Sequence, residues 1–504
     1  MNLLRSIDQA FSLIKEQQER ISFSFNLREY GEVVYVQKGI VYVKGLFDAG
    51  SEELLQFAGS QFGMVLGLEK ERIGVVLLDQ SEEIEAKMEV YRTGRVISAP
   101  VGEELLGRVV DPIGRPLDVI KAPLPEKRRA VEQPAPQVTD RLPVEVPLQT
   151  GIQAIDAMIP IGRGQRELIL GDRQTGKTAI AIDTIINQKD KDVICIYCSM
   201  GKESAAVKKV INDLTSHQAM EYTIIVAAFG KDSPGLNFLA PYSAMTMAEH
   251  FMENGRDVLV VFDDLTRHAW SYRELSLLLR RPPTREAYPG DIFYIHSRLL
   301  ERATRLKKEK GGGSITALPI IETEEQNISA YVPTNLISIT DGQIYLSPDL
   351  FQQGILPAID VGKSVSRVGG KTQLPVYRKL LKDLKLAYAQ FEELEAFSRF
   401  GTRLDEETKA KLLRGRRVRE VLKQNRLDPL KVAEQIALLR SLTKGWFDRL
   451  ELAAVASAKT KIRNAIHEKV PEICQKINRG EEWSEEEEKE FMGVIEDTIH
   501  KTKS

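Results

Sequence analysis

The chain has 504 residues, of which 42% are hydrophobic and 28% charged, and its formal net charge is −2 at pH 7. A chain of this length is too long for a single core, so we expect two to four domains. The near-neutral charge disfavours sequence-independent binding of nucleic acid, which needs a basic surplus. Three cysteines are too few for a disulfide framework, no apolar run approaches membrane-spanning length, and the first residues do not form a signal peptide. We therefore expect a cytoplasmic protein whose link to any membrane is made through partners.

The N-terminal quarter changes its hydrophobic period once. Residues 1–22 carry an apolar stripe at helical spacing, which predicts an amphipathic helix that packs on its own domain or docks on a partner. Residues 23–95 consist of short β-rich runs separated by glycines, which predicts a small closed β-barrel with no catalytic constellation. These runs are Val33–Val36, Ile40–Val43, Met64–Leu66 and Ile73–Leu78.

A proline-rich segment follows the barrel. Between residues 111 and 149 there are eight prolines, and proline at this density prevents regular helices and strands. We expect this segment to wrap around the next domain or to link to it. The nucleotide-binding domain is predicted to span residues 96–372.

A glycine-rich loop stands between an apolar run and a helical pattern, which is the context of a phosphate-binding P-loop. Its backbone N–H groups and the helix N-terminus would bind phosphate oxygens. Lys177 would reach the outer phosphates, and the Thr178 hydroxyl would bind Mg²⁺. The loop comprises Gly171, Asp172, Arg173, Gln174, Thr175, Gly176, Lys177 and Thr178. The sequence therefore predicts a site for a nucleoside triphosphate.

Three further β-rich runs alternate with helical patterns after the P-loop, which predicts a parallel sheet covered on both faces. They are 193–197, 223–226 and 258–262. Asp263 ends the last run, where a carboxylate would hold the Mg²⁺ shell beside the P-loop. Cys195 and Cys198 have metal-like spacing but no second pair, so we interpret them as core thiols.

Helical spacing dominates residues 373–504, which we predict to be a C-terminal helical domain. Patterns run from Tyr377 to Phe397, from Asp405 to Leu422 and from Leu430 to Leu442. Near the end, Ser484 precedes an acidic run in which Glu487 would complete a capping box.

Several long motifs resemble the α subunits of F-type ATP synthases. They are the P-loop with its Asp-Arg-Gln-Thr filling and the stretches 277–283, 288–302 and 357–367, and the likeness extends over residues 30–445. It implies a β-barrel, a RecA-like P-loop domain and a C-terminal helical domain. It also implies ATP or ADP with Mg²⁺ as ligands, a ring alternating with β subunits around a γ-containing stalk, a δ subunit that the N-terminal helix would dock on, and a peripheral place on the cytoplasmic face of a bacterial inner membrane.

The residue at the position of the catalytic base is not one that hydrolysis can use. In the β subunits of this family a glutamate orders the attacking water, and in α subunits a glutamine stands there. This chain has Lys202, whose ammonium cannot accept a proton, so we interpret its own site as non-catalytic. Glu203 is the alternative base, if the loop were shifted by one residue.

The resemblance implies a second role at a neighbouring site. Arg367 matches the family's arginine finger, which would stabilise charge on the phosphoryl group at the β site in trans. The residues before it are Ser364, Val365 and Ser366, which form the turn that aims it and which we group with it as catalytic. An ordinary surface ion pair is the alternative for a lone arginine.

The base of the nucleotide would contact Gln424, by family likeness, and Arg426 stands where a second glutamine is usual. Leu356 replaces an arginine. These departures, with Lys202 and a divergent tail beyond residue 452, indicate a diverged bacterial paralogue. The main alternative function is a self-sufficient hexameric P-loop ATPase, such as a translocase or a secretion motor; a purely structural ring member with a vestigial P-loop is the other.

Overall fold

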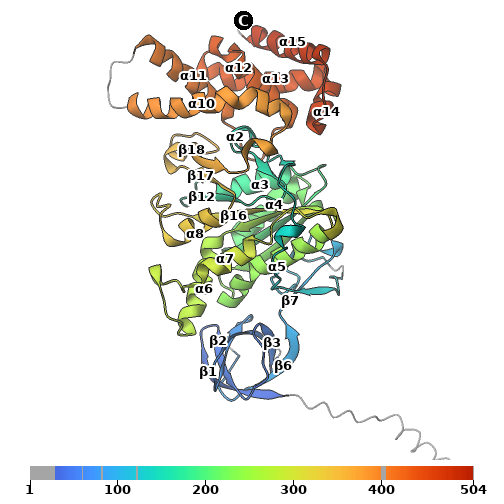
Figure 1. Ribbon diagram of the computed structural model, residues 1–504, viewed down its shortest axis with the longest axis vertical. Coiled ribbons are helices and arrows are strands. Elements are labelled where there is room, and N and C mark those ends of the chain that lie inside the picture. Colours follow the sequence, from blue (N-terminus) through green and yellow to red (C-terminus); the bar gives the residue numbers. More distant parts are fainter. Residues whose placement is uncertain (1–28, 60, 81–82, 121–122, 399–404, 503–504) are drawn as a thin grey trace, which may run out of the picture.

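The computed structural model describes residues 29–59, 61–80, 83–120, 123–398 and 405–502. Three layers are stacked along the longest axis: a β-barrel, a central sheet flanked by helices, and a set of helices that includes the C-terminus (Figure 1). The predicted fold class, a barrel followed by an α/β P-loop domain and a helical domain, is confirmed. The predicted helix over residues 1–22 lies outside the described residues.

The barrel closes from six antiparallel strands in the order β1-β2-β5-β4-β3-β6. The four predicted runs fall in β1, β2, β4 and β5, and two strands, β3 and β6, were not predicted. Its interior is filled by aliphatic side chains such as Val41, Val65 and Val75, all fully buried. The strands are β1 (Tyr30–Gln37), β2 (Ile40–Lys44), β3 (Glu53–Phe57), β4 (Phe62–Leu68), β5 (Ile73–Leu77) and β6 (Glu89–Val96).

The proline-rich segment contains only short elements. Among its described residues these are β9 (Arg128–Ala130), which pairs with β7 (Ser98–Pro100), a 3₁₀ turn at Val138–Asp140, and β10 (Pro147–Leu148), which pairs with β11 (Ile161–Gly162). The prediction that proline prevents long regular elements there agrees with this structure.

The central sheet has eight strands in the order β18-β17-β12-β16-β15-β13-β14-β8, and only β18 runs antiparallel to its neighbour. The strands are β8 (Val109–Val110), β12 (Glu167–Gly171), β13 (Val193–Lys202), β14 (Thr223–Phe229), β15 (Asp257–Asp263), β16 (Ser314–Glu322), β17 (Gly342–Leu346) and β18 (Ile359–Ser366). Because the inner strands are buried on both faces, they form continuous apolar runs, as the sequence predicted.

Alternate residues of the strands enter two different cores. One face packs against α3 (Lys177–Ile186) and α4 (Ser204–Ser216), and the other packs against α5 (Pro234–Glu253) and α6 (Leu265–Leu278). Cys195 and Cys198 lie within β13, fully buried and free, which confirms them as core thiols. The remaining helices of this domain are α2 (Gln153–Met158), α7 (Ile292–Leu300), α8 (Tyr331–Ile339) and α9 (Pro348–Gln352).

The C-terminal helices continue the first of these two cores. The three predicted patterns correspond to α10 (Pro375–Ser398), α11 (Glu406–Leu422) and α12 (Val432–Thr443). Two helices of the tail, α13 (Leu452–Lys469) and α14 (Pro471–Arg479), were not predicted. Before α15 (Glu485–Thr502), Ser484 Oγ accepts from Glu487 N, and the Glu487 carboxylate accepts from Ser484 N. The predicted capping box is therefore present. Within the described parts of the chain, no helix is long and apolar enough to cross a membrane.

Candidate nucleotide site

The P-loop connects the carboxyl end of β12 to the first turn of α3. Gly176 has a φ of 101°, a conformation that favours glycine, and α3 begins at the next residue. The first N–H groups of a helix have no partner within that helix, and here they point into the loop. Together with the partial positive charge of the helix N-terminus, they form the kind of site that binds a phosphate group.

Bonds within the loop fix its shape. Lys177 Nζ donates to the carbonyls of Gly171 and Asp172, at 2.8 and 2.5 Å, and Thr175 Oγ1 also donates to the Asp172 carbonyl at 2.8 Å. Burial lowers the pKa of Lys177. The Asp172 carboxylate accepts from Thr323 Oγ1 at 2.6 Å and therefore anchors the loop to the end of β16.

Two side chains of the loop face solvent. Arg173 is 75% exposed and lies 3.8 Å from Glu322, a weak surface pair, and Gln174 is exposed at a positive φ of 62°. These two side chains are free to turn toward an incoming phosphate, whereas Asp172 and Thr175 are committed to the shape of the loop.

Asp263 lies beside Thr178, as the sequence predicted from the end of the strand. Its Oδ2 accepts from Thr178 Oγ1 at 2.8 Å and from the hydroxyl of Tyr197 at 2.7 Å. Asp263 is almost fully buried, so these donors offset the cost of burying the carboxylate. Tyr197 was not singled out from the sequence. It lies on β13 opposite Val261 of β15, two residues before the pair of Ser199 and Asp263, and its hydroxyl therefore reaches the Asp263 carboxylate.

Lys202 completes this cluster. Its Nζ lies 2.5 Å from Asp263 Oδ2 and 3.1 Å from Thr178 Oγ1, and the side chain is 17% exposed. A β-bulge between Met200 and Lys202 places it there, because Gly201 is the extra residue and has a φ of 62°. Glu203, the alternative base, is exposed and is the N-cap residue of α4.

The oxygens of Thr178 and Asp263 are the hard donors that Mg²⁺ prefers. The third group at the same point is the ammonium of Lys202, which uses the same lone pairs that a metal ion would need. The neighbouring Asp264 is buried, and burial together with the charge of Asp263 raises its pKa to about 7. Within the described residues, no cluster of three or more His, Cys, Asp or Glu is arranged to hold a metal ion.

A mainly apolar cavity of about 240 Å³ opens next to the P-loop. It lies between α3, the end of β17 and the segment after α11. Its lining includes Ile152, Ala179, Ile180, Phe351, Leu356 and Gln424.

Gln424 lines this cavity, but its amide is engaged with the backbone. Its Oε1 accepts from Gln153 N at 3.1 Å, and its Nε2 donates to the carbonyls of Gly151 and Asp428, both at 2.8 Å. The side chain therefore fastens the segment after α11 to the start of α2. In this arrangement it has little capacity left to read a base.

Arg426 and Leu356, the other departures at this end of the site, also line the cavity. Arg426 pairs with Asp213 of α4, so its guanidinium is held at the rim. Leu356 is 44% exposed and its carbonyl accepts from Gln424 N at 2.9 Å. The base end of the cavity is thus apolar in the middle and carries a committed ion pair at its edge.

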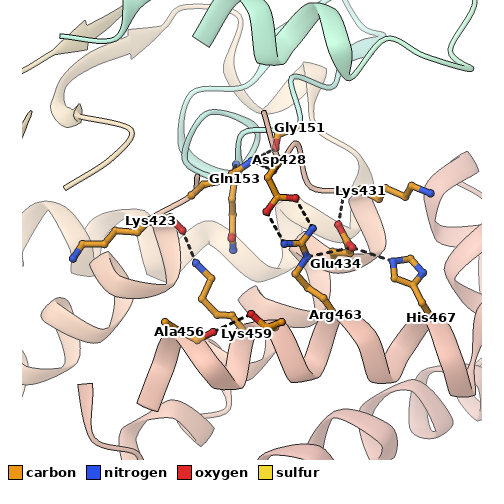
Figure 2. A network of polar contacts seen from close by, with 12 residues as sticks. Gly151, Gln153, Lys423, Asp428, Lys431, Glu434, Ala456, Lys459, Arg463 and His467 are labelled. Carbon is orange, nitrogen blue, oxygen red and sulfur yellow. Dashed lines mark hydrogen bonds and ion pairs between the residues drawn. The ribbon is translucent and has the colours of Figure 1, made fainter. Parts of the chain in front are cut away.

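Helix α13 of the C-terminal domain supports this same segment. Figure 2 shows Lys459, Arg463 and His467 on α13, all directed toward residues 423–434. Arg463 forms a two-pronged pair with Asp428 at 2.8 and 2.9 Å, and His467 Nε2 lies 3.0 Å from Glu434. Lys459 Nζ donates to the Lys423 carbonyl at 2.5 Å, and burial lowers the pKa of Lys459 to about 8. These three residues are four positions apart along α13, and this spacing is the sequence signal that places them on one face of the helix.

Arg367 follows the edge strand β18 and lies at the end of the sheet opposite to the P-loop. Ser366 pairs with Gly342, the first residue of β17, and Gly342 pairs with Glu167, the first residue of β12. The P-loop begins at the last residue of β12, four residues further on, which is about 13 Å along a strand. Arg367 donates to the carbonyls of Thr340 and Ile337, at 3.1 and 3.2 Å, and is exposed.

The three residues before Arg367 form its support. Ser364 Oγ donates to the Asp360 carbonyl at 2.6 Å, and Ser366 Oγ donates to the Pro160 carbonyl at 2.8 Å. Val365 is 44% exposed on the same strand. Since both hydroxyls bond to backbone, they fix the course of β18 and of the turn that carries the arginine. The structure thus brings the P-loop, Asp263, Gln424 and Arg426 around one site and places Arg367 with its three neighbours at another.

These features define a P-loop nucleotide-binding protein with a barrel and a helical domain on either side of the nucleotide domain. Family models agree with each layer: the ATP synthase alpha/beta family β-barrel domain matches residues 26–94, its nucleotide-binding domain matches residues 151–366, and its C-terminal domain matches residues 373–498. The chain belongs to the ATP synthase alpha/beta family.

Its relatives are similar over nearly their full lengths. A protein named ATP synthase subunit alpha 2, from Syntrophus aciditrophicus, is 58% identical over 98% of this chain and 95% of its own length. Another subunit alpha 2, from Syntrophotalea carbinolica, is 58% identical over 95% and 92%. ATP synthase subunit alpha 1 of Chlorobium luteolum is 54% identical over 100% and 98%. The sequence resemblance to this family is confirmed.

Proposed function

We propose that this chain is a nucleotide-binding, non-catalytic α subunit of a rotary F-type ATP synthase, and that it supplies Arg367 in trans to the active site of a β subunit. The observation that carries this proposal is the position of Arg367. It lies at the end of the sheet opposite to the P-loop of its own chain, exposed and held by two carbonyls at the end of α8. In that place the guanidinium is remote from its own P-loop and accessible to a neighbouring subunit.

The chemistry at the chain's own site supports the non-catalytic role. Hydrolysis needs a group that orders the attacking water and accepts its proton, and the position expected for that group is occupied by the ammonium of Lys202. Glu203 is exposed at the start of α4. The site therefore holds ATP or ADP without turning it over. Thr178 and Asp263 are the residues predicted to bind Mg²⁺, and the ammonium of Lys202 already contacts both of them.

In the assembled ring, Arg367 would neutralise charge that develops on the transferred phosphoryl group of the β site. Ser364 and Ser366 fix the course of the strand and of the turn that carry the guanidinium. Coupling to ion translocation then resides in β, γ and δ subunits and in a membrane rotor. This chain would lie peripherally on the cytoplasmic face of a bacterial inner membrane, with its residues 1–22 docked on the δ subunit.

Arginine substitution in the reconstituted complex tests this proposal. The full chain is assembled with the β and γ subunits of the same organism, and steady-state ATP hydrolysis is compared for the natural chain and for Arg367→Ala. We expect a loss of roughly a thousandfold, the lower end for an arginine finger. Arg367→Lys should recover little, because an ammonium lacks the fork geometry of the guanidinium.

Arg95→Ala is the matched control. Arg95 is exposed on β6 of the barrel, so its removal deletes the same group in a different domain from the turn of Arg367. Its complex should hydrolyse ATP at the natural rate. Unchanged hydrolysis in the Arg367→Ala complex, with the ring assembled, would contradict the proposed role in trans.

A further inference from the structure

Lys202 stands at the point where a nucleotide-bound metal ion would contact this chain. Its Nζ lies 2.5 Å from Asp263 Oδ2 and 3.1 Å from Thr178 Oγ1. These are the two oxygens that would serve the metal. Mg²⁺ takes six oxygen ligands in near-ideal octahedral geometry and gives up water reluctantly. It can therefore not bind Asp263 and Thr178 while the ammonium occupies their lone pairs.

The position of the ammonium is built into the strand. The bulge at Gly201 turns the Lys202 side chain toward the P-loop, and both polar groups of Gly201 are fixed. Gly201 N donates to Asn237 Oδ1 at 2.7 Å, and its carbonyl accepts from Arg267 Nη1 at 2.9 Å. Side chains from α5 and α6 thus hold the backbone that presents Lys202.

The charges of the cluster also favour a resident cation. Asp263 is 1% exposed, and its Oδ2 receives three donors, from Thr178, Tyr197 and Lys202. An ammonium has three N–H groups. Two of them are directed at Asp263 and Thr178, and the third remains for a phosphate oxygen, to which a charged donor forms a strong hydrogen bond. Lys177 supplies a second positive charge from the other side of the loop.

We propose that the P-loop of this chain binds nucleoside triphosphate without a divalent cation, with the ammonium of Lys202 in the place of Mg²⁺. This inference rests on the proposed nucleotide-binding role and adds that the nucleotide is bound free of metal. A site of this kind stays occupied when free Mg²⁺ falls, and it has no metal to promote hydrolysis.

Equilibrium dialysis of radiolabelled ATP against the full-length chain tests the proposal. Binding is measured once in excess Mg²⁺ and once in excess EDTA. We expect the dissociation constants of the natural chain in the two buffers to agree within about threefold. In Lys202→Gln, which removes the charge but keeps a polar side chain, EDTA should weaken binding at least tenfold and Mg²⁺ should restore it.

Lys208→Gln is the matched control, because Lys208 is an exposed residue on α4 and the substitution makes the same charge change. It should behave like the natural chain in both buffers. The proposal is overturned if EDTA weakens ATP binding to the natural chain tenfold or more while Mg²⁺ supports it. Absence of binding in both buffers would overturn it as well, together with the proposed nucleotide site, so the two failures are distinguishable. The comparison within the natural chain stands even if the variant does not fold.

Discussion

Lys202 and Asp263 form an ion pair, with 2.5 Å between Nζ and Oδ2, beside the P-loop threonine. The carboxylate is nearly inaccessible to solvent, whereas the lysine side chain is 17% exposed. Removing one partner of such a pair leaves a charge without compensation, and this costs more than removing both. The pair thus has structural as well as functional consequences.

A double-mutant cycle measures this coupling. We expect Lys202→Met and Asp263→Asn each to lower the thermal midpoint of the full chain, by about 5 °C for a cost of roughly 2 kcal/mol in a domain of this size. The double variant should lose about as much as one single variant, because neither charge then remains unpaired. Additive losses in differential scanning calorimetry would show that the two side chains do not interact.

The engagement of Gln424 with the backbone predicts weak selection of the base. Since its amide bonds to Gln153 N and to the carbonyls of Gly151 and Asp428, the cavity offers mainly apolar contact to a purine. We expect ATP and GTP to bind with dissociation constants within about threefold of each other, because an apolar pocket without a free polar partner cannot read the hydrogen-bonding edge that distinguishes the two purines. Competition dialysis checks this. A preference for ATP of a hundredfold would mean that Gln424 turns to the base.

The tail should influence the nucleotide cavity through α13. Arg463→Ala removes both prongs of the pair with Asp428 and the contact to Glu434, which loosens the segment that carries Gln424 and Arg426. We expect ATP to bind roughly three- to tenfold more weakly, about 1 kcal/mol for a partly exposed charged pair. Lys461→Ala, on an exposed position of the same helix, is the control and should leave affinity unchanged. Equal ATP affinities of the natural chain and both variants would show that α13 does not influence the nucleotide cavity.

Asp183 gives the stability of the chain a predictable pH dependence. Burial raises its pKa from 3.8 to about 6, while its Oδ1 accepts from Leu427 N at 2.9 Å. Between pH 4 and 6 the native state therefore binds more protons than the unfolded state, and stability falls as pH rises through this window. The loss amounts to about 3 kcal/mol above pH 6.

Asp183→Asn keeps the acceptor and removes the titration. Its thermal midpoint relative to the natural chain should therefore rise between pH 4 and pH 7, which scanning fluorimetry measures. The exposed Asp190→Asn serves as control and should follow the natural chain throughout. A constant difference between Asp183→Asn and the natural chain would contradict the raised pKa.

The P-loop could be predicted because its signal is local. Strand, glycine loop and helix follow one another from Glu167 to Ile186, and Asp263 is marked by the end of an apolar run. The barrel was predicted from four alternating runs. Strand β6 (EVYRTGRV) escaped prediction because polar and charged residues interrupt its apolar pattern and only Val90 is buried, and β3 (ELLQF) because Gln56 interrupts its apolar run.

The contacts that decide the chemistry are not local. Lys202 reaches Asp263 only because Gly201 forms a bulge, which depends on pairing with β14. Gln424 is saturated by Gly151 and Gln153, about 270 residues earlier in the chain. Such partners become visible only when the helical domain is placed on the nucleotide domain, and the family resemblance, which implies a base contact for Gln424, does not reveal them.

The most direct test of the central claim is ATP hydrolysis by the full-length chain alone, measured beside the same chain assembled with its β and γ subunits. We predict that the isolated chain binds ATP but shows no turnover above the buffer rate, and that the assembly hydrolyses ATP. Sustained turnover by the isolated chain, on the order of 1–10 per second as for an ordinary enzyme, would contradict the account. It would identify the chain as a motor in its own right, with Glu203 as the first residue to examine as base.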